Sequence, residues 1–134
     1  MATRSLTKVF DQNTEVFTLY RHWDGYPACH GMELATFLDG MTIGNGKGRD
    51  GNSKYCNGIG CFSEKLVSFF KKVEDSGDFY LYPAGTNNIG EEYTYNIIVN
   101  DNNQIGVNVV SYGMGIFSGT IVEFKEFCEK HLTQ

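Results

Sequence analysis

The sequence predicts an α+β fold: a largely antiparallel sheet of about four strands with two to three helices packed on one face, in the order β-α-α-β-β-β-α. Three observations predict it. Segments of alternating apolar and polar residues are joined by short turns, which favours antiparallel pairing. Other segments place apolar residues at helical spacing. Ten Phe and eight Tyr in 134 residues favour a substantial sheet, because aromatic side chains pack well on pleated surfaces.

The first strand is expected over Glu15–Trp23, where β-branched and aromatic residues alternate. The turn residues Asp24 to Pro27 would end it. A short helix is expected from about Gly31 to Asp39, because apolar residues recur there at i, i+4 and i+7. Gly40 stands where such a helix would end.

The glycine-rich stretch from Gly40 to Cys61 has no periodicity, so we expect a long loop or an irregular hairpin. The next helix is expected to begin with Ser63 as N-cap and to end near Gly77, because apolar residues between them form a stripe. A second strand is expected over Asp78–Pro83.

A β-hairpin is expected from Glu92–Val99 and Gln104–Tyr112, because both segments alternate and a cluster of Asn and Asp turn residues separates them. The last helix should begin at Thr120, which forms a capping box with Glu123. Apolar residues then recur at helical spacing as far as Leu132, so one face of this helix should be buried.

Composition excludes several classes of partner. The formal net charge is −5 and there is no run of basic residues, so we expect no nucleic-acid partner and no membrane partner. Met1 to Phe10 lacks the apolar core of a signal peptide. We therefore expect a single cytoplasmic domain over residues 1–134. In that compartment the four cysteines would be reduced thiols; they are Cys29, Cys56, Cys61 and Cys128.

Polar and aromatic residues gather at the end of the first predicted strand and in the turn after it. Such a junction lets a rigid sheet present polar groups to a ligand. His22 and Asp24 lie on the same side of an extended chain, so they are also candidates for an acid–base pair. The alternative interpretation is structural, with Asp24 capping the turn and Trp23 packing. The candidate binding residues here are Arg21, His22, Trp23, Asp24, Tyr26 and His30.

The run Arg21-His22-Trp23-Asp24-Gly25-Tyr26-Pro27 resembles a short signature of small, uncharacterised proteins of bacteriophage and environmental bacterial genomes. The resemblance covers Tyr20 to Gly31 and extends to the segment from Ile116 to Thr120. It implies a phage-like accessory protein. It implies no activity, and no catalytic residue is carried over from it.

A second candidate is the segment from Gly44 to Lys54, where a glycine-rich backbone and the side chains of Lys47 and Arg49 could hold an anion. The alternative is a solvated loop, since the segment lacks the P-loop pattern. The spacing of Cys and His does not match the tight ligand pairs of structural zinc sites. We therefore expect no metal and no cofactor.

These observations predict a non-enzymatic cytoplasmic binding protein. Its partner would be an unknown protein or a small anionic ligand, held by the Arg21–His30 turn and the Gly44–Lys54 loop at one end of the sheet. One alternative is a small hydrolase or transferase acting on a phosphorylated metabolite or nucleotide, with His22 and Asp24 as acid–base groups. Another is a purely structural domain that forms a homo-oligomer. A homodimer is also expected because an open sheet has two edges to protect.

Overall fold

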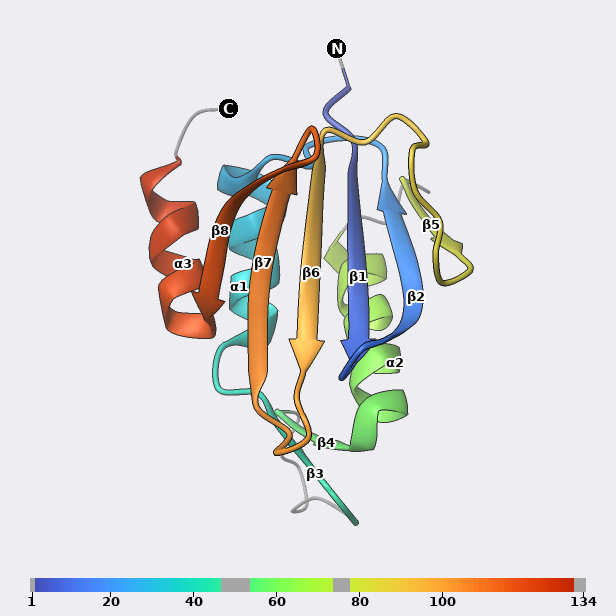
Figure 1. Cartoon of the computed structure of the whole chain (residues 1–134), viewed down its shortest axis with the longest axis vertical. Helices are drawn as coiled ribbons and strands as arrows, with labels where there is room; N and C mark the ends of the chain where they lie inside the picture. The colour runs from blue at the N-terminus through green and yellow to red at the C-terminus, as the bar shows by residue number, and fades with distance from the viewer. Residues whose placement is uncertain (1, 47–53, 74–77, 132–134) are drawn as a thin grey trace.

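The computed structural model describes residues 2–46, 54–73 and 78–131, and its main feature is a six-stranded sheet in the order β5-β2-β1-β6-β7-β8 (Figure 1). The three α-helices lie on one side of this sheet (Figure 1). The strands of the large sheet are β1 (Ser5–Asp11), β2 (Thr14–Arg21), β5 (Phe79–Tyr82), β6 (Tyr93–Val99), β7 (Ile105–Ser111) and β8 (Met114–Thr120), and the helices are α1 (Met32–Leu38), α2 (Gly58–Val73) and α3 (Ile121–Lys130).

The predicted α+β class is confirmed, but the predicted strand count and order are wrong. β1 was missed because Ser, Thr and Lys interrupt its apolar pattern, although it lies in the middle of the sheet. β8 was missed because Gly115 and Gly119 lower its strand propensity. A tight turn at Tyr112 and Gly113, both with positive φ, returns the chain from β7 into β8.

The sheet is mixed rather than antiparallel throughout. β1 pairs in parallel with β6, from Ser5 opposite Tyr93 to Asp11 opposite Val99, and every other pair in this sheet is antiparallel. The predicted hairpin is confirmed as β6 and β7. A second, two-stranded parallel sheet of β3 (Thr42–Gly44) and β4 (Tyr55–Asn57) forms within the stretch that was expected to be a loop.

The helix boundaries differ from the prediction in two places. A π-helical turn, η1 (Pro27–Gly31), precedes α1. α2 begins at Gly58, so Ser63 lies inside the helix and is not its N-cap. The capping box of α3 is confirmed, since Glu123 N donates to Thr120 Oγ1 at 3.2 Å and Thr120 N donates to Glu123 Oε1 at 2.9 Å.

The apolar core lies between the helices and one face of the sheet. The alternate residues Tyr95 and Ile97 of β6 and Val107 and Val109 of β7 point into it and are almost fully buried. Phe124 of α3 packs against the same cluster. No helix within the described ranges is long and apolar enough to cross a membrane. We call the opposite face of the sheet, which none of the described helices covers, the open face.

Candidate functional site

Close backbone contacts hold the turn after β2 against the sheet. Gly25 N donates to Thr3 O at 2.8 Å, and Tyr95 Oη donates to Gly25 O at 2.8 Å. A Cβ at Gly25 would lie 2.7 Å from Ser5 Cβ, so glycine is needed at this close approach. The turn therefore enters η1 along a fixed path, which carries His30 into the core.

His30 is fully buried and its polar atoms are paired. Its Nδ1 lies 3.1 Å from Arg21 Nη1, and its Nε2 lies 2.7 Å from Thr7 Oγ1. A guanidinium only donates, so Nδ1 accepts and the ring proton is on Nε2, which donates to Thr7. The ring stacks on Phe70 at 4.6 Å and contacts Tyr95 at 4.9 Å. His30 is thus a neutral side chain built into the core.

Burial, together with the neighbouring positive charge of Arg21, lowers the pKa of His30 well below its ordinary value of 6.5. Glu33, which pairs with Arg21, supplies the carboxylate of this network. The unfolded chain therefore binds a proton at His30 at a higher pH than the folded chain does. The stability that depends on neutral His30 is complete above the unfolded pKa and is lost as the pH falls toward the folded pKa.

We expect acidification below about pH 6.5 to lower the free energy of unfolding by at most about 1.4 kcal/mol per pH unit, the limit for one proton. Urea unfolding at several pH values between about 5 and 8 measures this slope. His30→Gln, whose amide does not titrate, should show a flatter profile even if it is less stable throughout. Equal slopes in the two proteins would contradict this role of His30.

Arg21 is also buried, at 3% exposure, and joins β2 to α1. Its Nη1 donates to Glu33 Oε1 at 2.5 Å, and its guanidinium lies 5.0 Å from the centre of the Phe79 ring. Cys29 Sγ lies 3.8 Å from Glu33 Oε2. Burial and the Glu33 carboxylate raise the pKa of the Cys29 thiol, which disfavours a nucleophilic thiolate here. Arg21 and His30 therefore support the fold from inside.

The predicted residues His22 and Trp23 contribute to a partly exposed aromatic cluster, in which Tyr20 is buried at 8% exposure. His22 and Trp23 contact each other edge to face at 4.8 Å, and Tyr20 Oη lies 2.9 Å from His22 Nδ1. Tyr20 in turn contacts Tyr80 at 5.9 Å and Tyr82 at 6.1 Å, across the β2–β5 pair. Trp23 is 45% exposed and Tyr80 51%. We call these five residues the aromatic patch.

Asp24 and Tyr26 shape the turn rather than join that patch. Asp24 is exposed, adopts a left-handed φ of 60°, and accepts a backbone hydrogen bond from His30 N at 3.2 Å. Tyr26 O accepts from Gly31 N at 3.4 Å, the i+5 hydrogen bond that starts η1. His22 Nδ1 is paired with Tyr20, and no hydrogen bond between His22 and Asp24 occurs among the described residues. The acid–base pair drawn from spacing is therefore not formed here.

Lys47 and Arg49 lie outside the described residues. The strands β3 and β4 that flank them lie at the end of the molecule opposite to the turn after β2 (Figure 1). Lys54 Nζ donates to Thr36 O at 3.0 Å and to Phe37 O at 2.8 Å, so it caps the carboxyl end of α1. The expectation that the turn and this loop act together at one end of the sheet is therefore wrong for the described part of the loop.

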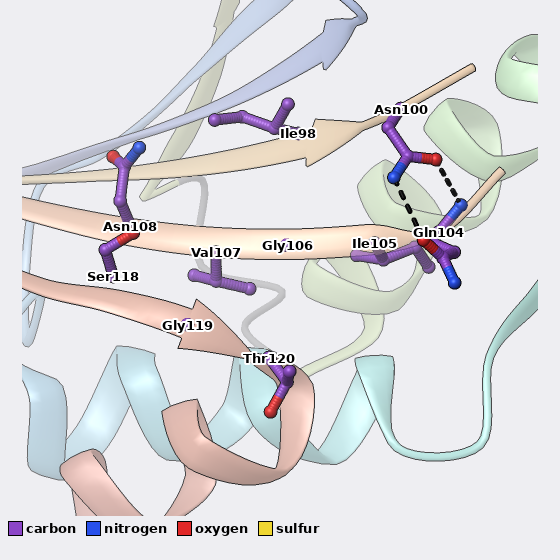
Figure 2. Close-up of a pocket in the computed structure, with 10 residues that line it drawn as sticks. All are labelled: Ile98, Asn100, Gln104, Ile105, Gly106, Val107, Asn108, Ser118, Gly119 and Thr120. Carbon is purple, nitrogen blue, oxygen red and sulfur yellow. Dashed lines mark hydrogen bonds between the residues drawn. The ribbon is translucent and has the colours of Figure 1, made fainter. Parts of the chain in front are cut away.

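The open face carries a shallow groove across β1, β6, β7 and β8. One end of it is a hollow of about 480 Å³. Asn108 and Ser118 line this hollow from neighbouring strands (Figure 2). Asn96 Nδ2 donates to Asn108 Oδ1 at 2.7 Å. Asn96 also lines the adjoining hollows, of about 270 and 420 Å³. The groove is wide, open and rich in amides, so it can exchange hydrogen bonds with an uncharged polar surface.

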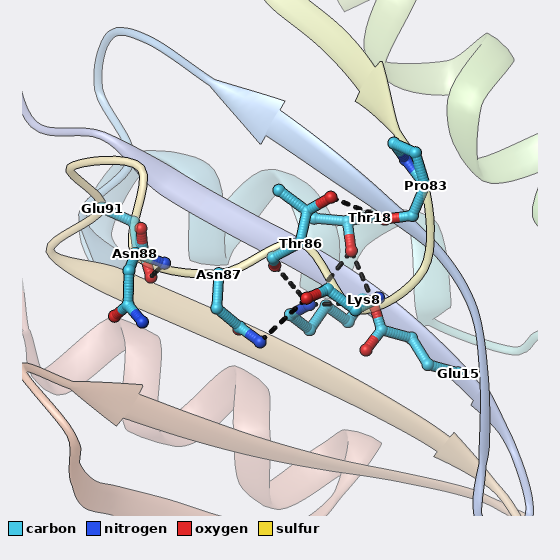
Figure 3. Close-up of polar contacts among 9 residues, drawn as sticks. Lys8, Glu15, Thr18, Pro83, Thr86, Asn87, Asn88 and Glu91 are labelled. Carbon is cyan, nitrogen blue, oxygen red and sulfur yellow. Dashed lines mark hydrogen bonds and ion pairs between the residues drawn. The ribbon is translucent and has the colours of Figure 1, made fainter.

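A buried ion pair fixes the loop between β5 and β6 onto the open face (Figure 3). Lys8 Nζ donates to Glu15 Oε2 at 2.8 Å, to Thr18 Oγ1 at 3.0 Å and to Thr86 O at 2.7 Å. Glu15 Oε2 also accepts from Gly85 N at 2.8 Å. Burial alone would raise the pKa of Glu15, but these hydrogen bonds outweigh it and lower that pKa. The loop therefore separates the aromatic patch from the amide-lined groove.

The sequence pattern indicated His22 and Trp23 as binding residues but did not indicate Tyr80 and Tyr82. Tyrosines are frequent in strands, so their presence in a strand does not by itself predict a binding surface. The signal that was present is the short run Phe79-Tyr80-Leu81-Tyr82, which exposes apolar groups if the strand is at an edge. Edge position depends on the strand order, and that order rests on β1, which the pattern did not reveal.

The described ranges contain no group of three or more His, Cys, Asp and Glu side chains arranged to hold a metal ion. All four cysteines are free thiols, without a disulfide among them. No family model, no curated protein and no solved structure matches this chain.

Proposed function

We propose that this protein is a non-catalytic binding protein that captures a protein partner through the aromatic patch and the adjacent edge strand β5. The observation that carries the proposal is a cluster of contacting aromatic rings, with Trp23 and Tyr80 about half exposed, at one edge of the sheet. Tyrosine and tryptophan at a surface are typical anchors of protein interfaces, because each buries a large area for little lost rotamer freedom.

β5 has exposed apolar groups on both of its faces. Leu81, at 63% exposure, points away from the aromatic patch and lines a hollow of about 380 Å³ with Val16, Phe17 and Val67. Exposed contiguous apolar surface of this kind marks interaction sites. Neither the hollows of the open face nor the hollow beside Leu81 is enclosed. An enclosed pocket is usual for small-molecule sites, so these surfaces favour a protein partner.

The backbone of β5 supports strand addition as the mode of binding. His22 N donates to Asp78 O at 3.0 Å, and by alternation Tyr80 and Tyr82 also face β2 with their backbone groups. The N–H and C=O groups of Phe79 and Leu81 then point toward the outer edge of the described sheet. An extended peptide pairing there would place alternate side chains against the aromatic patch and against Leu81.

The test is to select extended peptides that bind the whole protein from a library and to measure their affinities for variants. We expect Trp23→Ser and Tyr80→Ser each to weaken binding about 30-fold, the equivalent of about 2 kcal/mol for an interface anchor. Tyr112→Ser is the matched control, since Tyr112 is 80% exposed in the β7–β8 turn, away from the patch. Selected peptides that bind all three variants equally would overturn the proposal.

A further inference from the structure

Three sulfur atoms from separate segments meet where the small sheet joins α2. Met41 directly precedes β3, Cys56 is the central residue of β4, and Cys61 lies in the first turn of α2. The parallel pairing of β3 with β4 places Ile43 opposite Cys56. Met41 lies two residues before Ile43, and its side chain therefore lies near that of Cys56. Cys56 Sγ lies 3.4 Å from Met41 Sδ, and Cys61 is a side-chain hydrogen-bond partner of Cys56.

Burial differs among the three sulfur-bearing residues in a way that suits an ion site. Cys56 is fully buried, Met41 is 9% exposed, and Cys61 is partly exposed. Met41 also lines a surface hollow of about 530 Å³, together with Lys54 and Lys65. The cluster therefore borders solvent at Met41 and Cys61, while Cys56 lies away from water.

We propose that Met41, Cys56 and Cys61 form a binding site for a soft monovalent cation of the Cu⁺ and Ag⁺ class. Two thiolates and a thioether are the ligands that such ions prefer over harder divalent ions. Binding exchanges two thiol protons for one cation: the two S–H bonds break, sulfur–metal bonds form, and two protons leave to solvent.

Distance and charge support this ligand set. Metal–sulfur bonds of about 2.3 Å in a trigonal arrangement put the sulfur atoms about 4 Å apart. The 3.4 Å separation of Cys56 and Met41 therefore has to open by about half an ångström, which the flexible thioether permits. The loaded cluster carries one net negative charge. Lys54 and Lys65 line the hollow beside Met41, so positive charges lie near the loaded cluster.

The ligand set also argues against a divalent ion. Structural zinc sites take four ligands, usually with additional thiolates or imidazoles. No group of three His, Cys, Asp and Glu that could hold a metal is present in the described part of the chain. The site is thus limited to three soft donors, and the thioether of Met41 distinguishes it from a simple pair of thiols.

The experiment titrates the full chain, reduced and free of oxygen, with Ag⁺ and with Cu⁺ supplied from a chromophoric chelator. Cys29→Ser serves as the background, because Cys29 is a partly exposed thiol outside the cluster. We expect one tightly held equivalent in this background. Met41→Leu, which conserves volume, should fold normally and weaken binding at least tenfold. Cys61→Ser should weaken it at least a hundredfold.

Cys128→Ala in the same background is the matched control, because Cys128 is a buried thiol on α3 far from the cluster in sequence. It should keep the one equivalent. Zn²⁺ in the same assay should not compete with Ag⁺. The proposal is overturned if no equivalent is retained, if Met41→Leu binds as tightly as its background, or if Cys128→Ala loses the ion.

Discussion

Lys8→Met is expected to lower the free energy of unfolding by about 3 kcal/mol. Lys8 is 3% exposed and its ammonium group makes three hydrogen bonds, so its loss leaves the Glu15 carboxylate without its cation. Breaking a buried ion pair costs about 3–5 kcal/mol. The lower end applies because the Glu15 side chain keeps 15% exposure and retains Thr18 and Gly85 as donors. Urea unfolding followed by circular dichroism measures the change.

The double variant Lys8→Met/Glu15→Leu tests the cause. Replacing both charges by apolar groups removes the stranded carboxylate, so most of the stability should return. The loop from Pro83 to Glu92 should nevertheless lose protection from hydrogen exchange at Gly85, because Gly85 N then has no carboxylate to bind. A double variant less stable than Lys8→Met would contradict the account of Lys8 and Glu15 as a pair.

Arg21→Ala is expected to cost about 3 kcal/mol as well. The substitution removes the hydrogen bonds to His30 and Glu33, and it removes the stem that packs beside Phe79. A buried acceptor on His30 then lacks its donor, and a cavity is left. The free energy of unfolding from urea titration gives the result.

Arg21→Met and His22→Ala are the controls for this prediction. Methionine keeps most of the buried volume, so Arg21→Met should lose roughly half as much stability, leaving mainly the polar contribution. His22→Ala lies next to Arg21 in sequence but on the open face, and it should change stability by less than about 1 kcal/mol. Similar losses in Arg21→Ala and His22→Ala would contradict the distinction drawn between buried network and exposed patch.

The fold class could be predicted from the sequence because the strongest patterns are local. The β6–β7 hairpin and the capping box of α3 depend on residues close in sequence, and both were found. β1 could not be found in this way. Its Lys8 is buried only because Glu15 and the Thr86 carbonyl reach it from other segments, and no periodicity encodes such a partner.

The candidate site was predicted in part for a similar reason. The run around the first turn contains both kinds of residue, buried and exposed, and composition does not separate them. Strand alternation places Arg21 toward the core and His22 toward the open face, with the opposite consequences for accessibility. Tyr80 and Tyr82 are exposed at a sheet edge only because β5 is the outermost strand. That position depends on the order of all the strands in the sheet.

The parallel pairing of β1 with β6 has a consequence for the order in which the chain folds. The β1–β2 hairpin and the unit from β6 to α3 each bring together residues that are near neighbours in sequence, so both can form early. Joining them requires Ser5 to pair with Tyr93, which closes most of the chain into a loop. The conformational entropy of this closure is lost before burial of apolar surface can offset it. This joint is therefore the expected rate-limiting step, and until it closes both halves carry an exposed strand edge that a chaperone would recognise.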